Sequence, residues 1–100
     1  MKLKLTYSGF MFLYELLRDE TFKPEPKETI AKIVRLILVG LYKKFYSKAH
    51  TKESKYNIKL NPVEALAFKL YFRAHSFPNA SFEGNLINQI ITSIHQKYQL

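Results

Sequence analysis

The chain contains no cysteine, so disulfide bridges, thiolate metal ligands and thiol nucleophiles are all excluded. Glycine is scarce, and because Gly9, Gly40 and Gly84 stand far apart, no glycine-rich phosphate-binding loop is present. Long apolar runs are also missing. The most apolar stretch, residues 33–42, contains Arg35 and falls well short of the roughly 20 residues needed to span a bilayer.

The N-terminal residues carry a weak likeness to a secretion signal. Lys2 and Lys4 precede an apolar run at 10–13, but Glu15 and Arg18 interrupt that run and no small-residue cleavage site follows. We therefore expect a cytoplasmic protein with no membrane attachment. The 100 residues, 47% of them hydrophobic, fit a single folded domain over 1–100.

No catalytic or metal-binding constellation is visible. The histidines His50, His75 and His95 show no metal-ligand spacing. Asp19 and Glu20 are adjacent in a predicted loop, where we expect them to be solvated. Asn79 begins a glycosylation pattern, which we interpret as accidental in a protein without a secretion signal. We expect no cofactor and no enzymatic activity; an enzyme assembled from distant residues stays the third alternative.

The sequence indicates an internal repeat. An apolar–Lys–apolar run at 3–5 recurs at 58–60, which is the alternation of a half-buried strand. Each run precedes a helix-capping residue: Thr6, with Ser8 as the alternative, and Asn61. The second cap is strong, because a proline follows it at once and a glutamate three residues later, as in a capping box; Ser81 is expected to cap the last helix.

Two long helices carry apolar stripes with the same spacing. The stripes are Ile30, Ile33, Val34, Ile37, Leu41 and, 57 positions on, Ile87, Ile90, Ile91, Ile94, Tyr98. We predict that most of both stripes is buried together with two further residues. The predicted core residues are Ile33, Val34, Ile37, Leu41, Ile87, Ile90, Ile91, Ile94, Leu60 and Phe68. The repeated pattern divides the chain into two related halves, 1–49 and 56–100.

The predicted fold is α+β and mostly helical: two strand–helix–helix repeats, with a two-stranded antiparallel ribbon packed on four helices. The chemically generic pattern identifies no protein family. The predicted strands span 2–6 and 56–60, and the predicted helices span 7–18, 27–48, 62–74 and 82–98.

The helix predicted at 27–48 is apolar nearly all round its middle, which indicates burial on more than one side. A second copy of the protein would cover the extra face, and Gly40 would allow a close backbone approach. The alternative is that loops and the first helix cover this face. The residues of the predicted dimer interface are Leu36, Val39, Gly40 and Tyr42.

Positive charge is concentrated in one segment. Residues 32–59 carry eight basic side chains against Glu53 alone, whereas residues 1–31 are balanced. One interpretation is a nucleic-acid surface of lysines interleaved with aromatic rings. The other is a solvated helix end and loop, which the excess of lysine over arginine favours, because the reading of bases relies strongly on arginine. The candidate contacts are Lys43, Lys44, Lys48, Lys52, Lys55, Lys59, Tyr46 and Tyr56.

The function we expect from these observations is a non-enzymatic protein-interaction module, homodimeric or bound to another protein. A basic accessory protein that binds nucleic acid is the alternative. The apolar helix carries the first hypothesis, and the basic segment carries the second.

Overall fold

Four helices and a two-stranded antiparallel sheet form a mostly helical α+β fold in the computed structural model, which describes residues 1–73, 77 and 81–98. The elements along the chain are β1 (Lys2–Thr6), α1 (Tyr7–Thr21), α2 (Thr29–Lys48), β2 (Lys55–Lys59), α3 (Pro62–Phe72) and α4 (Phe82–Tyr98). The fold class and the order of elements are as predicted. Residue 74, at the end of the third predicted helix, lies outside the described residues.

The two strands pair antiparallel, as the alternating sequence runs predict. Leu3 stands opposite Ile58, and Leu5 stands opposite Tyr56. These four side chains are buried, while the residues between them are exposed, because successive side chains of a strand point to opposite faces. The ribbon is extended at one end, where Leu60 N–H donates to the Met1 carbonyl at 2.8 Å.

The predicted caps are confirmed. The Thr6 hydroxyl accepts from Gly9 N–H at 3.1 Å, and the Ser81 hydroxyl accepts from Gly84 N–H at 3.0 Å. Asn61 and Glu64 form a reciprocal capping box: Asn61 Oδ1 accepts from Glu64 N–H at 2.7 Å, and Glu64 Oε1 accepts from Asn61 N–H at 2.9 Å. Each cap satisfies N–H groups that the first helical turn leaves without a partner.

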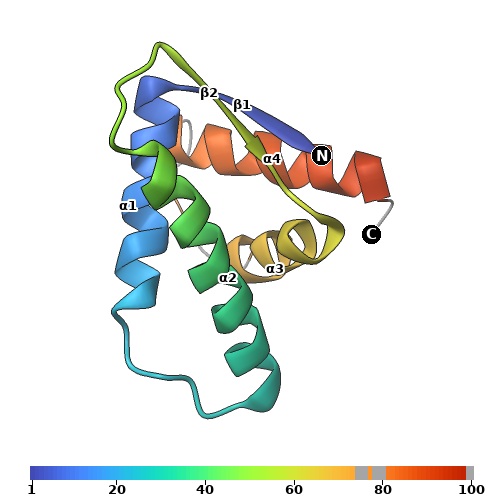
Figure 1. Ribbon diagram of the computed structural model, residues 1–100. Coiled ribbons are helices and arrows are strands. Elements are labelled where there is room, and N and C mark those ends of the chain that lie inside the picture. The colour runs from blue at the N-terminus through green and yellow to red at the C-terminus, as the bar shows by residue number, and fades with distance from the viewer. Residues whose placement is uncertain (74–76, 78–80, 99–100) are drawn as a thin grey trace.

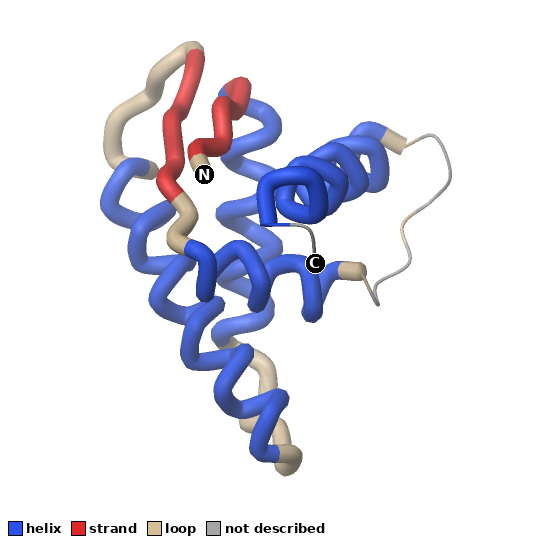
Figure 2. Tube along the Cα trace, turned by 90° about the vertical axis from the view of Figure 1, so that its right-hand side faces the viewer, coloured by secondary structure: helices blue, strands red, loops and turns tan. Residues whose placement is uncertain are grey.

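The ribbon and the α1–α2 loop lie at opposite ends of the molecule, as Figures 1 and 2 both show. α1 and α2 run side by side between these two ends (Figure 1). α3 packs across α2, and α4 packs against α3 and α1. The core lies between the ribbon and the helices and is rich in aromatic rings. Its largest fully buried side chains include Phe10, Phe45, Phe68 and Phe72.

The buried stripe of α4 is confirmed, because Ile87, Ile90 and Ile94 all face the core. The prediction for α2 was wrong in part: Ile33 is 53% exposed, Ile30 is 64% exposed, and Val34 and Ile37 are only partly buried. The residues that α2 buries are Leu38, Leu41 and Phe45. These residues have the same i, i+3, i+7 spacing as Ile87, Ile90 and Ile94 of α4. Each lies 49 residues before its α4 counterpart, whereas the sequence predicted a separation of 57.

α2 buries a different stripe from the predicted one because it carries apolar side chains on several sides. Lys32 and Lys43 mark one side of α2 as exposed, but the apolar Leu36 lies in the same row, so this mark is weak and the contacts with α1 and α3 decide which apolar stripe is buried. None of the helices in the described part of the chain combines the length and the apolar character that a bilayer crossing demands.

Candidate functional surfaces

The outer face of α2 is apolar and open. Leu36 is 72% exposed, and it lies on the same side of the helix as the exposed Ile33 and Gly40. A methyl group added to Gly40 would meet no heavy atom within 4 Å. Neither α1 nor a described loop covers Leu36, although α1 packs against Tyr42 and the α1–α2 loop lies beside Val39, as the alternative explanation for the apolar character of α2 expects. We call the residues Ile33, Leu36, Ile37 and Gly40 the outer stripe of α2.

The other two residues predicted for a dimer interface lie elsewhere on α2. Tyr42 is half-buried against α1, where its ring stacks on Tyr14 with centroids 5.6 Å apart. A side-chain hydrogen bond with Tyr14 raises the pKa of Tyr42. Val39 is half-buried and lines a pocket beside the α1–α2 loop. Leu36 and Gly40 therefore share one exposed side of α2, whereas Tyr42 packs against α1.

The candidate lysines are spread over three elements. Lys43 and Lys48 are exposed on α2, Lys52 is exposed in the following loop, and Lys55 and Lys59 are exposed on β2. The Lys52 ammonium lies 5.1 Å from the centroid of the Tyr7 ring.

Lys44 differs from the other lysines, because its charge is matched. Its ammonium lies 2.6 Å from Oε1 of Glu64 and donates to the Lys59 carbonyl at 3.0 Å. This contact ties α2 to β2 and to the capping box of α3, which is a structural role.

Tyr56 was expected to stack on nucleic-acid bases, and this prediction was wrong. The residue is 2% exposed, and its ring stacks on Phe10 with centroids 3.9 Å apart. Its hydroxyl donates to the Thr51 carbonyl at 2.8 Å and accepts from Glu53 N–H at 3.0 Å. Tyr46 is half-exposed and meets the His50 ring edge-on, so it remains accessible.

The ribbon brings together a basic surface that the sequence segment alone did not reveal. Its outward side chains are Lys2, Lys4 and Thr6 from β1 and Lys55, Asn57 and Lys59 from β2. Lys2 and Lys4 belong to the charge-balanced first part of the chain, so counting charge along the sequence missed them. Lys2 and Lys4 can be assigned to this surface when the alternation of side chains in both strands is combined with the pairing of β1 with β2.

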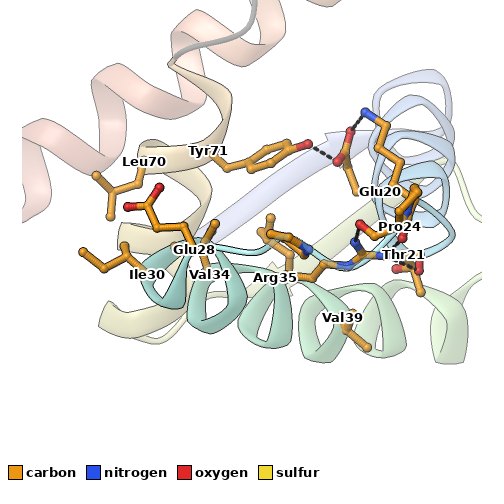
Figure 3. Close-up of a pocket in the computed structure, with 14 residues that line it drawn as sticks. Glu20, Thr21, Pro24, Glu28, Ile30, Val34, Arg35, Val39, Leu70 and Tyr71 are labelled. Atoms are coloured by element: carbon orange, nitrogen blue, oxygen red, sulfur yellow. Dashed lines mark hydrogen bonds and ion pairs between the residues drawn. The ribbon is translucent and has the colours of Figure 1, made fainter.

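A pocket of about 450 Å³ opens between the end of α1, the first turns of α2 and the end of α3. Val34, Leu38 and Leu70 contribute apolar walls. Val34 and Leu70 are labelled in Figure 3. Glu20 lies on one side and Tyr71 on the other, and the Tyr71 hydroxyl donates to the Glu20 carboxylate across the gap (Figure 3).

The polar groups of this pocket are engaged within the protein. The Glu20 carboxylate also pairs with the Lys23 ammonium at 2.5 Å. The Arg35 guanidinium donates to the carbonyls of Thr21 and Pro24, both at 2.7 Å, and to that of Lys23. These contacts hold the α1–α2 loop against α2. The pocket is therefore lined mainly by apolar side chains, and the polar groups at its edge bind one another.

Glu20 was expected in a solvated loop, and this prediction was wrong. α1 continues through Thr21, and Glu20 is 9% exposed. The missed signal is its spacing, because Glu20 follows Leu13 by seven residues and Leu17 by three, on the buried face of the helix.

Within residues 1–73, 77 and 81–98, no group of three or more histidine, aspartate and glutamate side chains is arranged to hold a metal ion. His75 and Asn79 lie outside the described residues. Comparisons with protein-family models, with curated proteins and with solved structures gave no match.

Proposed function

We propose that this protein is a non-enzymatic interaction module that forms a homodimer through the outer stripe of α2. The observation that carries the proposal is the exposure of large apolar side chains along one side of a single helix, above all Leu36 at 72%. An open apolar helix face of this kind is typical of a surface that binds a partner.

The spacing of the stripe suits a helix–helix contact. Ile33, Leu36, Ile37 and Gly40 follow an i, i+3, i+4, i+7 pattern, which places them in one row along the helix. Open space around Gly40 allows a second backbone to approach closely. A two-fold partner would place its own stripe on this one, because such interfaces use the same patch on both subunits.

The polar rim supports the same arrangement. Lys32 and Lys43 are exposed and flank the stripe along α2. An apolar centre with a charged edge is the composition of protein interfaces, in which charge is depleted at the centre.

The test is molar mass by light scattering over a dilution series. We expect the wild-type protein to approach twice 11.8 kDa at high micromolar concentration and to dissociate on dilution. Leu36→Glu and Ile33→Glu should each give a folded monomer, because either places a charge at the centre of the contact.

Asn88→Glu is the matched control. It adds the same charge at an exposed position of α4 and should leave the dimer intact. A wild-type protein that keeps a mass of 11.8 kDa at high micromolar concentration would refute the homodimer. The outer stripe would then be assigned to a different protein partner.

We also propose that the two halves of the chain descend from one strand–helix–helix unit. The support is the register: Leu3 stands opposite Ile58, its counterpart 55 positions later, as a two-fold axis through that pair requires. Buried positions of α1 and α3 share this offset, since Leu13 matches Phe68 and Leu17 matches Phe72. Superposition of the halves in an experimentally determined structure tests the proposal.

A further inference from the structure

The outward face of the ribbon is uniformly basic or neutral. Four of its six side chains are lysines, and the other two are Thr6 and Asn57. Among the described residues no carboxylate pairs with Lys2, Lys4, Lys55 or Lys59. The contrast with Lys44, which Glu64 neutralises at 2.6 Å, shows that this face is left without countercharge.

The pairing register makes this arrangement unfavourable in the isolated protein. Lys2 stands directly opposite Lys59, and like charges in opposed positions of two strands destabilise the pair. The N-terminal ammonium, which donates to the Leu60 carbonyl at 2.8 Å, adds positive charge at the same end of the ribbon. A polyanion bound on this face would supply the missing countercharge.

We propose that the outward face of the ribbon binds duplex DNA and lies in its major groove. That groove is about 12 Å wide and admits a two-stranded ribbon, whose strands lie about 5 Å apart. Five residues per strand extend about 17 Å, which matches about five base pairs at 3.4 Å each. The helices pack behind the ribbon, so its outward face is open to a ligand of this size (Figure 1).

The residue types divide into two roles. The four lysines of the face suit phosphate contacts, which fix the position on the duplex. Asn57 lies at the centre opposite Lys4, and its side chain has no hydrogen-bond partner in the described structure. An asparagine in this position suits a bidentate contact with the edge of an adenine.

The same geometry argues against other nucleic acids. The major groove of A-form RNA is deep and narrow, so a ribbon cannot enter it. Single strands are held by stacking on exposed aromatic rings, and the outward face of the ribbon carries none, since Tyr56 points inward.

The first experiment measures binding of the full chain to a labelled DNA duplex of mixed sequence by fluorescence anisotropy, at about 50 and 200 mM salt. Four lysine–phosphate contacts predict that affinity falls ~100-fold over this range. Lys4→Gln combined with Lys59→Gln should leave two contacts, and the fall should shrink to ~10-fold.

Lys27→Gln combined with Arg73→Gln is the matched control. It removes the same charge from exposed positions away from the ribbon and should keep the ~100-fold fall. The circular dichroism spectra of both double variants should equal that of the wild type, because all four side chains are exposed. The urea midpoint of the ribbon variant should not fall below that of the wild type, because Lys59→Gln removes the like charge opposite Lys2.

The second experiment selects sites from a random duplex library. The wild type should enrich an adenine-containing site, and Asn57→Ala should lose ~10-fold or more of that preference while its salt dependence stays unchanged.

Four results would overturn the proposal. They are no binding to duplex DNA at the lower salt concentration, equal effects of the two double variants, equal or tighter binding to single-stranded DNA or duplex RNA, and binding to phosphatidylserine vesicles in place of DNA. Equal effects of the double variants would mean that diffuse net charge, and not the ribbon, attracts DNA.

Discussion

Tyr56 shows how a single aromatic side chain can connect several elements. Its ring stacks on Phe10 of α1, and its hydroxyl holds the loop before β2 through Thr51 and Glu53. The residue therefore fixes where β2 begins, and the basic ribbon depends on it for its shape.

We predict that Tyr56→Phe lowers the free energy of unfolding by about 1–2 kcal/mol, because the ring remains but two hydrogen bonds are lost. Urea denaturation measures the change. Tyr46→Phe is the control, since Tyr46 is half-exposed, and its effect should stay within about 0.5 kcal/mol. Equal costs for both variants would mean that the Tyr56 hydroxyl does not hold the loop.

Asn61 supports a second prediction at this scale. Asn61→Ala removes the side-chain acceptor for Glu64 N–H and should cost about 1 kcal/mol in the same measurement. Asn88→Ala, at an exposed position of α4, should change stability by less than about 0.5 kcal/mol. A loss no larger than that of the control would show that α3 begins equally well without its cap.

At the scale of the element, α2 presents two different apolar stripes. Leu38, Leu41 and Phe45 face the core, whereas Ile33 and Leu36 of the outer stripe face away from it and Ile37 lies at the boundary. We predict that Leu41→Ala costs about 2–5 kcal/mol, through lost transfer energy and a cavity. Ile33→Ala should cost less than about 0.5 kcal/mol.

Both α2 variants are best measured with Leu36→Glu also present, so that association does not contribute to stability. Ile90→Ala on α4 serves as the positive control, because Ile90 is buried and should also lose about 2–5 kcal/mol. A larger loss for Ile33→Ala than for Leu41→Ala would mean that α2 is rotated from the orientation described.

How far the sequence predicts these elements depends on how local the deciding contacts are. The capping box of Asn61 and the alternation around Ile58 are local signals, and both predict the structure correctly. α4 is also predicted, because its polar residues mark the exposed side. α2 carries a weaker mark, because Leu36 lies in the same row as the exposed Lys32 and Lys43, and the positions of α1 and α3 decide that Leu38 faces inward and Ile33 outward.

The candidate surfaces follow the same division. The apolar excess of α2 is visible in the sequence, and Leu36 and Gly40 are found from it. The basic ribbon brings Lys2 opposite Lys59 across 57 residues, and the pocket joins Glu20 to Tyr71 across 51. Such juxtapositions come from tertiary pairing, which no local pattern records.

At the scale of the whole molecule, each half depends on the other. β1 pairs with β2, and α2 packs on both α1 and α3, so neither half contains a complete core. We predict that a fragment of residues 1–54 shows no cooperative urea transition by circular dichroism as a monomer, because its strand and the inner face of α2 lack partners. A cooperative transition in the monomeric fragment would show that one half folds alone.

The strand pairing also sets when the basic face can exist during synthesis. β1 leaves the ribosome first, but its partner strand follows only after α1 and α2 have emerged. Closing a loop of this length carries an entropy cost that must be met before the strand contacts form. A nascent chain therefore exposes Lys2 and Lys4 without their partner strand until β2 has emerged. The paired basic face that we propose binds a duplex forms only after that point.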